Sequence, residues 1–542
     1  MKKGKLMDKL PRIWSRTLLI LLLTIIVTLP CSIQPVKADP SNVIATYGEG
    51  YLEDVNGLLV LHVKGSPYEM GYQYGFMLRD RVQANIQYGI GGLIGMSHSY
   101  EYLVNCAQAM EPYTPQEYIE EMQGLADGAN VSYIDVLILQ VLPDIDSQLG
   151  GCSGFVVFGN ATTDGHLYHG RNADFSFPPE MIPLVTGLVT VYEPENGNVY
   201  VSVGGFGEIR TFSGMNNQGI TVGMKGSRSA DVSLDGMPFG LMLRQVLQYS
   251  NNITEAIDII CQTPRISGWN ILLGDGKNLN AAAVEISANY CKVFWPGDPA
   301  EDIEPHYNIT NAVRRANHYV DPDLAATQRS PYDPRVGWNW SWNRYEKLSQ
   351  LIEDNYGNIT AETSMDFIRT PPVAWYPINY ICILFDSTDL ELWVAYANST
   401  TPAYLREFIY LSHDDLFSPY TPDVPDVPEG CFIATAAYGT PMTSEIEILR
   451  NFRDQYLLTN SLGQAFVDAY YSISPPIAEF ITDHPGLKPI VRAGLLPAVV
   501  MSTIAINTTM VEKTATLGLL VLGSVALAIW MIRRRRRDSE YT

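Results

Sequence analysis

A cysteine between small residues, in the run Gly151-Cys152-Ser153-Gly154, has the surroundings of a nucleophile. It opens the apolar, strand-like stretch CSGFVVFG, and its small neighbours leave room for a tight turn with an exposed sulfur. A thiolate in such a position can attack a carbonyl carbon. Two other interpretations stay open at this point: a small buried apolar side chain, or one half of a disulfide.

The segment HGRNADF, residues 169–175, adds two charged groups shortly downstream. A guanidinium near a thiol favours the thiolate, and a carboxylate can orient an ammonium or an imidazole. Side chains on a strand alternate between its two faces, so Arg171 and Asp174 need a bend to point the same way. Asn172 and Ala173 could supply that bend, but the spacing alone does not establish it.

Taken as one stretch, GCSGFVVFGNATTDGHLYHGRNADF (151–175) resembles the nucleophile strand pair of N-terminal-nucleophile (Ntn) hydrolases. It is most similar to the acyl-CoA:6-aminopenicillanate acyltransferase family, which is related to choloylglycine hydrolase, acid ceramidase and N-acylethanolamine acid amidase. Five further segments match family motifs in order: VKGSPYEMGYQYGFML (63–78), GLADGANVSYIDVLILQ (124–140), SGMNNQGITVG (213–223), ANHY (316–319) and SWNRYEKL (341–348). One departure is Asn217, which stands where the family hairpin usually carries an acid.

The resemblance implies a self-cleaving precursor without a cofactor or a metal ion. The chain would cut itself between Gly151 and Cys152 and free the Cys152 α-amine. An amine with a pKa near ~8 can act as base for the neighbouring thiol. Cys152 would then attack an amide carbonyl and form an acyl-enzyme that water or an amine resolves.

The same resemblance assigns roles to four other residues. Arg171 would hold the thiolate, and Asp174 would hold the freed amine. Asn317 would donate to the oxyanion, unless it only caps a turn before Asp321. Arg344 aligns with a family arginine and either joins the site or packs on a helix surface.

Three further ionisable side chains are expected to lie outside the chemistry. His169 and His318 are not needed as bases, because the α-amine fills that role, so both are predicted to be packed or solvated. Glu285 lies in the apolar run AAAVEIS and is either buried with a shifted pKa or placed at a sheet edge.

The predicted elements must bring these residues together. Apolar patterning predicts one strand at 52–64, hairpins around Asn196-Gly197 and within 210–226, and strands at 270–273 and 281–286. Helices are expected at 66–88, 114–129, 132–141, 239–249 and 254–262. This order indicates an α+β protein, and the resemblance implies an Ntn αββα sandwich of two antiparallel sheets flanked by helices.

The charge distribution excludes a nucleic-acid-binding role and separates the ends from the body. Residues 1–38 carry a formal charge of +6, and residues 533–542 carry +3. Because the whole chain carries −22, residues 39–532 carry −31. Phosphate binding needs clustered Lys and Arg, which so acidic a body lacks.

Both ends have the patterns of membrane-related segments. Residues 1–38 combine a basic start, the apolar run LLILLLTIIVTL and the small-residue pattern Val36-Lys37-Ala38, which predicts a cleaved secretory signal; an uncleaved anchor is the alternative. Residues 514–532 are uncharged and precede Arg533–Arg537, which predicts one transmembrane helix with a cytoplasmic tail at 533–542 and an extracellular body. Residues 493–511 form a weaker second candidate span.

The body is predicted to divide further. Residues 39–151 form an N-terminal segment, 152–417 the catalytic segment and 418–430 a linker rich in Pro and Asp. Residues 431–513, which begin with CFIATAAYGT, resemble a recurrent C-terminal module of prokaryotic surface proteins. The cysteines after residue 38 are too sparse for a disulfide scaffold and show no CxxC metal pattern.

The expected function is that of a membrane-anchored amidohydrolase or acyltransferase acting on a small N-acyl amide. An ester-cleaving relative resembling phospholipase B-like proteins, and an idle scaffold that only binds at the surface, are the alternatives. The sequence does not identify the substrate or the oligomeric state.

Overall fold

The computed structural model describes most of the chain up to residue 418. The described residues are 43–95, 98–145, 150–175, 181–182, 187–301, 307–329, 340–375, 378–418 and 487–507, with single residues and two pairs between 434 and 484. Two compact units are present, Met1–Pro419 and Tyr420–Thr542. The predicted signal, the transmembrane segment 514–532, its tail, and all of the linker except Ser418 lie outside the described residues.

A ten-stranded sheet forms one half of the first unit. Its strands, in spatial order, are β1 (Val43–Tyr47), β2 (Gly50–Val55), β3 (Leu58–Gly65), β6 (Leu188–Pro194), β7 (Tyr200–Gly204), β8 (Ser213–Asn216), β9 (Ile220–Gly226), β10 (Trp269–Asp275), β11 (Asn280–Ile286) and β12 (Cys291–Phe294). The prediction of purely antiparallel sheets is wrong at one place, because β3 and β6 run parallel. A parallel pair needs a long crossover, and here the chain between β3 and β6 supplies helices and two strands of the other sheet.

A six-stranded antiparallel sheet forms the other half. Its strands, in spatial order, are β13 (Ala312–Arg315), β4 (Gly150–Val157), β5 (Tyr168–Phe175), β14 (Asn379–Asp386), β15 (Glu391–Tyr396) and β16 (Ile409–Leu411). β4 is therefore an interior strand between β13 and β5.

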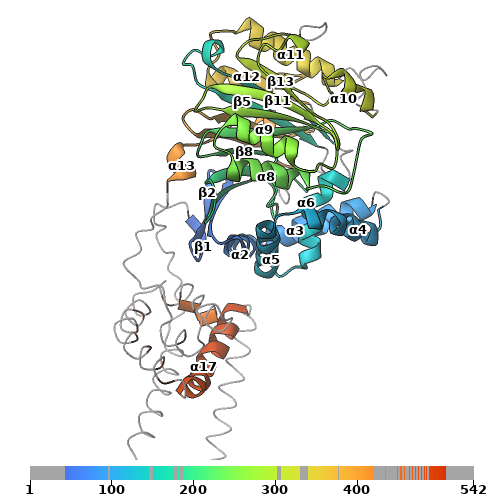
Figure 1. The fold of residues 1–542 in the computed structure, drawn as a ribbon. Helices are drawn as coiled ribbons and strands as arrows, with labels where there is room; N and C mark the ends of the chain where they lie inside the picture. The colour runs from blue at the N-terminus through green and yellow to red at the C-terminus, as the bar shows by residue number, and fades with distance from the viewer. Residues whose placement is uncertain are drawn as a thin grey trace, which may run out of the picture. The chain divides into compact units, whose positions relative to one another are not determined.

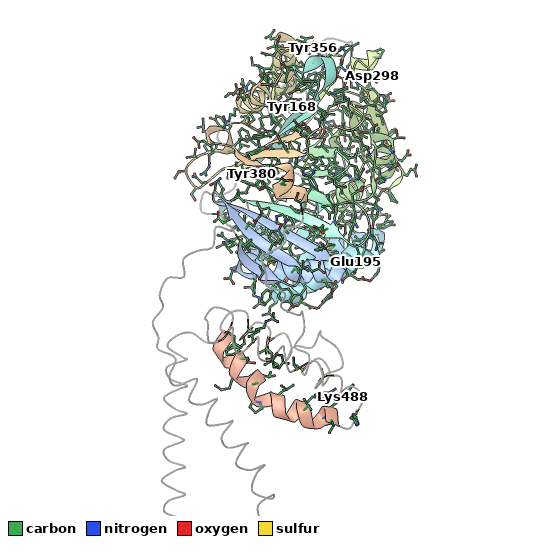
Figure 2. All side chains as sticks on the ribbon, turned by 90° about the vertical axis from the view of Figure 1, so that its left-hand side faces the viewer. Tyr168, Glu195, Asp298, Tyr356, Tyr380 and Lys488 are labelled. Atoms are coloured by element: carbon green, nitrogen blue, oxygen red, sulfur yellow. A yellow bond between two sulfur atoms is a disulfide. The ribbon has the colours of Figure 1, made fainter. Side chains whose placement is uncertain are left out.

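The two sheets pack face to face, and helices cover their outer faces (Figure 1). One apolar cluster between the sheets joins Val60, Val189 and Val201 of the larger sheet to Ile381 and Ile383 of the smaller one. This confirms the predicted α+β arrangement in αββα layers, with side chains filling the space between the layers (Figure 2).

The helices belong to two sets. Seven helices share one apolar cluster with the larger sheet: α2 (Pro67–Met77), α3 (Arg79–Gly95), α4 (Tyr100–Met110), α5 (Gln116–Ala129), α6 (Tyr133–Ile145), α8 (Phe239–Tyr249) and α9 (Ile253–Gln262). The principal helices on the smaller sheet are α11 (Trp340–Asp354) and α12 (Ala361–Arg369). Short helices α10 (Pro322–Thr327) and α13 (His413–Phe417) complete the unit.

Two predicted elements are divided in the structure. The strand expected at 52–64 is a hairpin of β2 and β3, because Asn56 and Gly57 adopt positive φ angles of 54° and 87° in the turn between them. The helix expected at 66–88 consists of α2 and α3, which are separated at Leu78. The predicted start of α2 is confirmed, since Ser66 and Glu69 form a capping box.

The second unit contains α17 (Lys488–Asn507), which overlaps the weaker candidate span. Among the described residues, no helix combines the length and the apolar character needed to cross a bilayer.

The glycines of two family-like motifs explain how α2 and α5 pack so closely. A Cβ atom at Gly71 would lie 2.0 Å from the carbonyl oxygen of Glu121, and one at Gly124 would lie 2.1 Å from that of Tyr68. Neither contact can be relieved by rotating a side chain, because both partners are backbone atoms.

Replacing Gly124 by alanine is therefore expected to lower the free energy of unfolding by about 1–3 kcal/mol, since the helices must move apart. Urea unfolding followed by circular dichroism measures this change. Gly91→Ala in α3 is the matched control, because open space surrounds that position, and it should leave stability unchanged or slightly raised. Equal losses in the two variants would contradict the packing argument.

Candidate active site

Cys152 is the third residue of β4 and is 8% exposed in the intact chain. Its register partner on β5 is Ala173, and Gly154 pairs with Arg171. Paired residues of antiparallel strands share a face, so Cys152, Gly154 and Arg171 all point toward the larger sheet. The structure therefore brings the predicted nucleophile and the predicted arginine together.

The Arg171 guanidinium is fixed from three sides. Its Nη2 donates to Cys152 Sγ at 3.4 Å, its Nη1 to Ser213 Oγ at 2.5 Å, and its Nε to the Met224 carbonyl oxygen at 2.9 Å. These bonds leave the positive charge directed at the sulfur, where it favours the thiolate.

Asn317 binds the other polar group of the nucleophile. Its Oδ1 accepts a hydrogen bond of 2.8 Å from the Cys152 backbone nitrogen, and its Nδ2 donates to the Gly226 carbonyl oxygen at 2.8 Å. The alternative in which Asn317 caps the following turn is wrong, because Asp321 itself caps α10.

Asp174 lies on the opposite face of β5 from Arg171, because the β4–β5 register is continuous as far as Gly150 and Phe175. The bend considered from the sequence is absent from this pairing. Asp174 forms an ion pair with Arg344 and accepts a 2.9 Å hydrogen bond from Asn379 Nδ2. Burial raises the pKa of the Asp174 carboxyl, and the Arg344 charge opposes that rise.

The expected direct contact between Asp174 and the Cys152 nitrogen is thus replaced by a chain of contacts in the intact protein. Arg344 Nη1 donates to Asn317 Oδ1 at 3.3 Å while Nη2 binds Asp174. Arg344 therefore joins the site, which resolves the choice left open by the sequence. Its place on α11, a helix of the outer layer, links Asp174 to the cysteine through Asn317.

Gly151 has no room for a side chain. A Cβ atom there would lie 2.8 Å from Arg344 Nη1 and 2.9 Å from Trp375 Cε3. The peptide bond before Cys152 is thus held against a guanidinium and an aromatic ring.

Lys225 is a site neighbour that the sequence did not indicate. It lies on β9, is 0% exposed, and donates to the Gly223 carbonyl oxygen at 3.1 Å. Lys225 follows Met224 and precedes Gly226, whose carbonyl oxygens bind Arg171 and Asn317. The sequence offered one signal, a lysine near the end of the apolar run ITVGMKG. A lysine in that position is ordinarily exposed, so the run did not indicate a buried one.

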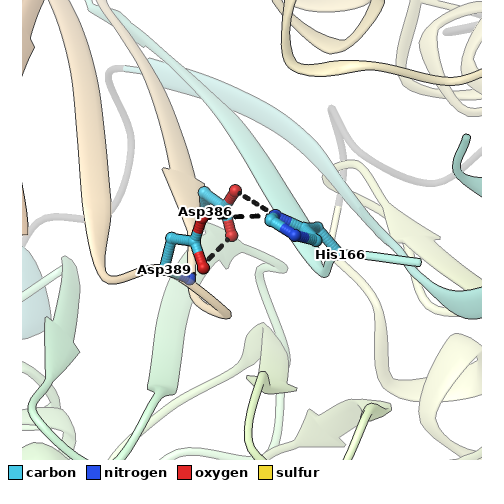
Figure 3. Close-up of side chains that lie close together, drawn as sticks. All are labelled: His166, Asp386 and Asp389. Atoms are coloured by element: carbon cyan, nitrogen blue, oxygen red, sulfur yellow. Dashed lines mark hydrogen bonds and ion pairs between the residues drawn. The ribbon is translucent and has the colours of Figure 1, made fainter. Parts of the chain in front are cut away.

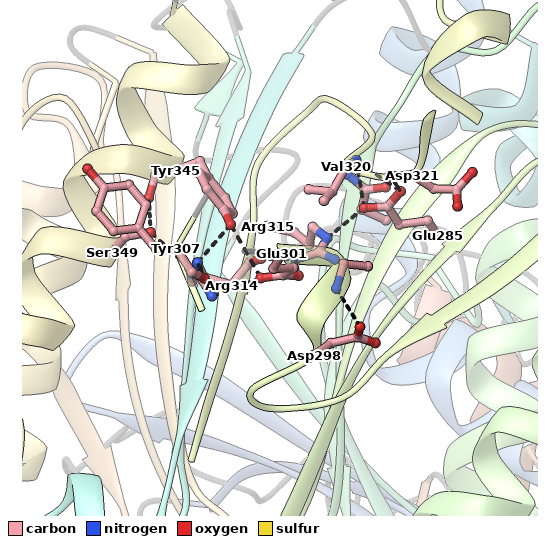
Figure 4. A network of polar contacts seen from close by, with 12 residues as sticks. Glu285, Asp298, Glu301, Tyr307, Arg314, Arg315, Val320, Asp321, Tyr345 and Ser349 are labelled. Atoms are coloured by element: carbon pink, nitrogen blue, oxygen red, sulfur yellow. Dashed lines mark hydrogen bonds and ion pairs between the residues drawn. The ribbon is translucent and has the colours of Figure 1, made fainter. Parts of the chain in front are cut away.

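The side chains expected outside the chemistry are buried. His169 Nδ1 lies 2.9 Å from Thr221 Oγ1, and burial lowers the pKa of this histidine well below its ordinary value. His318 Nδ1 lies 2.7 Å from Ser341 Oγ. Glu285 is interior rather than at an edge and binds Arg315 Nε at 2.7 Å within a buried network (Figure 4).

Cys261 and Cys291 form a disulfide between α9 and β12. The sequence did not predict this pair. Cys152 is a free thiol, so the disulfide interpretation of the nucleophile is wrong.

Within the described part of the chain, one cluster has side chains that could bind a metal ion, and it lies just before β5 and at the end of β14. His166, Asp386 and Asp389 place one ligand atom each within 4.8 Å of one another (Figure 3). His166 Nδ1 and Asp386 Oδ2 are already 2.8 Å apart in a direct hydrogen bond, so an ion would have to displace that bond. The hydrogen bond between His166 and Asp386 therefore explains why these side chains lie close together, without a metal ion.

Replacing Arg344 by an uncharged residue should leave Asp174 as a buried acid without its cationic partner. Arg344→Met is expected to lower the free energy of unfolding by about 3–5 kcal/mol at neutral pH. The loss should grow as pH rises through the raised pKa of Asp174 in the wild type, because above it the wild-type carboxyl ionises beside Arg344 while the variant's buried carboxyl retains its proton. Urea unfolding at several pH values measures it, and adding Asp174→Asn should restore much of the loss; a double variant as unstable as the single one would contradict the pairing.

The His166–Asp386 pair should make stability depend on pH. Burial alone would lower the pKa of His166, but the Asp386 carboxylate outweighs it and raises the pKa. His166→Gln is therefore expected to cost on the order of 1 kcal/mol below pH 6, with the difference shrinking as pH rises through the raised pKa. His413→Gln is the control for thermal unfolding, because His413 and Asp414 are both exposed; a cost independent of pH would contradict this assignment.

Comparisons with known proteins agree with the motifs. Residues 161–377 match the family described as "Acyl-coenzyme A:6-aminopenicillanic acid acyl-transferase", a range that includes Arg171, Asp174, Asn317 and Arg344 and begins after Cys152.

Individual relatives are similar over part of their length. An uncharacterized protein of Archaeoglobus fulgidus is 31% identical over 404 residues, covering 65% of this chain and 66% of that protein, just under two thirds. The rat N-acylethanolamine-hydrolyzing acid amidase is 22% identical over 239 residues, covering 42% of this chain and 64% of that enzyme. Among solved structures, the Caenorhabditis elegans ortholog of that amidase has 15% identity and a TM-score of 0.33, covering 44% of this chain and 93% of its own; this likeness is too weak to carry an inference. Residues 161–377 are therefore similar to that acyl-transferase family, and the chain shares sequence with the two relatives over part of its length.

Proposed function

We propose that this chain is a cysteine amidohydrolase or acyltransferase that cleaves itself between Gly151 and Cys152 and acts on small N-acyl amides. The observation that carries the proposal is that both polar groups of Cys152 have dedicated partners. The sulfur faces Arg171 at 3.4 Å, and the backbone nitrogen faces Asn317 at 2.8 Å. A buried cysteine that served only for packing would need neither contact.

The nitrogen contact suits the amine that cleavage would release. Once the peptide bond is broken, the Cys152 nitrogen becomes an α-amine that can still donate to Asn317 Oδ1. Its lone pair can then take the proton of its own thiol. Arg344 donates to Asn317 Oδ1 and is itself held by Asp174. We therefore assign Arg344 and Asp174 a positioning role.

Turnover would follow the acyl-enzyme route. The Cys152 thiolate attacks the substrate carbonyl, the protonated α-amine gives its proton to the leaving amine, and water or an acceptor amine releases the acyl group from sulfur. Asn317 Nδ2, which binds the Gly226 carbonyl in the intact chain, is the proposed oxyanion donor after processing.

The substrate class follows from the same chemistry and from the relatives. The family description names an acyl transfer to 6-aminopenicillanic acid, and the rat relative is named for hydrolysing N-acylethanolamines. Both reactions make or break a linear amide at an acyl carbonyl. A screen of N-acyl amides of graded chain length, with matched esters, tests this class; release from esters alone would favour the ester-cleaving alternative.

The proposed enzyme is exported and anchored by residues 514–532, with its body outside the cell. The basic and apolar pattern of residues 1–38 supports export. The Cys261–Cys291 disulfide also supports it, because such bonds persist mainly in oxidising compartments. Cell fractionation and protease accessibility of the intact cell would test this placement.

Removing the nucleophile should abolish both activities. Cys152→Ala is expected to remain a single chain on reducing gels, while the wild type separates into two fragments, the larger beginning at Cys152. N-terminal sequencing identifies that end, and amide hydrolysis should fall to the background rate.

Cys106→Ala is the matched control, because Cys106 is another buried free thiol in α4, away from the proposed site. It should process as the wild type does. Identical migration of wild type and Cys152→Ala would contradict self-cleavage, and labelling of neither Cys152 nor its amine by an acylating probe would favour the idle scaffold.

A further inference from the structure

Lys225 is a buried amine in the space between the two sheets. Its side chain is 0% exposed between the two sheets, and Nζ donates to the Gly223 carbonyl oxygen at 3.1 Å. Among the residues that the structure describes, no carboxylate forms an ion pair with it. Burying an unpaired ammonium is costly, so such a group is expected to lose its proton.

A glycine makes room for Lys225 beside the nucleophile. A Cβ atom at Gly154 would lie 2.9 Å from Lys225 Nζ and 3.0 Å from its Cε. Gly154 and Cys152 are alternate residues on the same face of β4, which puts them about 7 Å apart along the strand. Lys225 and Cys152 also interact electrostatically, and a water molecule between the two side chains can carry a proton from Sγ to Nζ.

The groups around Lys225 favour its neutral form. Burial, Arg171 of β5 and Arg315 of β13 lower its pKa well below the ordinary value, and the Cys152 thiolate opposes them. His169 of β5 also faces it and is neutral, because burial lowers the pKa of that histidine. Lys225 can therefore act as a base rather than as a fixed charge.

The intact chain needs such a base. Before cleavage the Cys152 nitrogen is an amide that donates to Asn317, so it has no lone pair available for the thiol proton. We propose that Lys225 accepts the Cys152 thiol proton during self-cleavage, before the α-amine exists. This inference rests on the self-cleavage proposed above and adds the residue that starts it.

The proposed step balances without any external redox partner. Lys225 takes the proton from Sγ, and the thiolate attacks the Gly151 carbonyl carbon. The Gly151–Cys152 C–N bond then breaks, the nitrogen receives the proton from the Lys225 ammonium, and Gly151 is left as a thioester on Sγ. Water hydrolyses that thioester to the Gly151 carboxylate and the Cys152 thiol, the released proton passes to the new α-amine, and Lys225 is neutral as before.

The test measures how fast the Gly151–Cys152 bond is cleaved in the full-length chain. The chain is made by cell-free translation with a pulse of label, and its fragments are separated on reducing gels over time. Lys225→Met and Lys225→Arg are both expected to cleave at least about 100-fold more slowly, because neither side chain can take up the proton. Lys277→Met is the matched control, since it removes an exposed lysine, and it should cleave at the wild-type rate. Thermal unfolding checks the fold, and Lys225→Gln, which keeps a donor for Gly223, is used if Lys225→Met is unfolded.

Hydroxylamine separates a role in proton transfer from a general disturbance of the site. It cleaves thioesters, so it should leave the slow variants slow if Lys225 acts before the thioester forms. Restoration of cleavage by hydroxylamine, a wild-type rate for Lys225→Arg, or a rate within threefold of wild type for the folded neutral variants would each overturn the proposal. A wild-type chain that stays intact would instead contradict the proposed self-cleavage itself.

Discussion

One hydrogen bond, from the Cys152 backbone nitrogen to Asn317 Oδ1, connects every layer of the candidate site. The two residues are 165 positions apart in the sequence, and the bond joins interior strand β4 to the loop that follows β13. Asn317 in turn binds Gly226 on the larger sheet and Arg344 on an outer helix. Displacing any of these elements would move the nitrogen that we propose becomes the catalytic amine, so the αββα packing and the proposed chemistry share one constraint.

Buried charge is distributed unequally around that bond. Arg344 is paired with Asp174, and Arg315 with Glu285 and Glu301, so each of these buried guanidinium groups has a carboxylate that offsets part of its desolvation cost. Arg171 faces the sulfur from β5 and is held by neutral oxygens, so its charge favours the thiolate form of Cys152. Lys225 of β9, which we propose to be uncharged, offers a destination for the thiol proton.

Sequence patterns predicted the residues and elements whose positions depend on nearby sequence. Cys152 and Arg171 lie on paired strands joined by a short connection, and α2, α5 and the later hairpins follow their caps and turns. The partners of Asp174 in the intact chain, Arg344 and Asn379, were not predicted because they come from elements more than 160 residues away. Lys225 was missed because a lysine near a strand end is usually exposed, and only the packing of β9 against β4 buries it. The Cys261–Cys291 disulfide likewise depends on how α9 meets β12, which cysteine spacing does not encode.

Mass spectrometry of the acyl-enzyme tests the central claim most directly. Wild-type protein is mixed with an N-acyl amide substrate, quenched in acid and digested, and the peptide carrying Cys152 is analysed. The account predicts a peptide that begins at Cys152 and carries the acyl group on sulfur. An acyl group on another residue, or turnover by protein whose Gly151–Cys152 bond is intact, would contradict it.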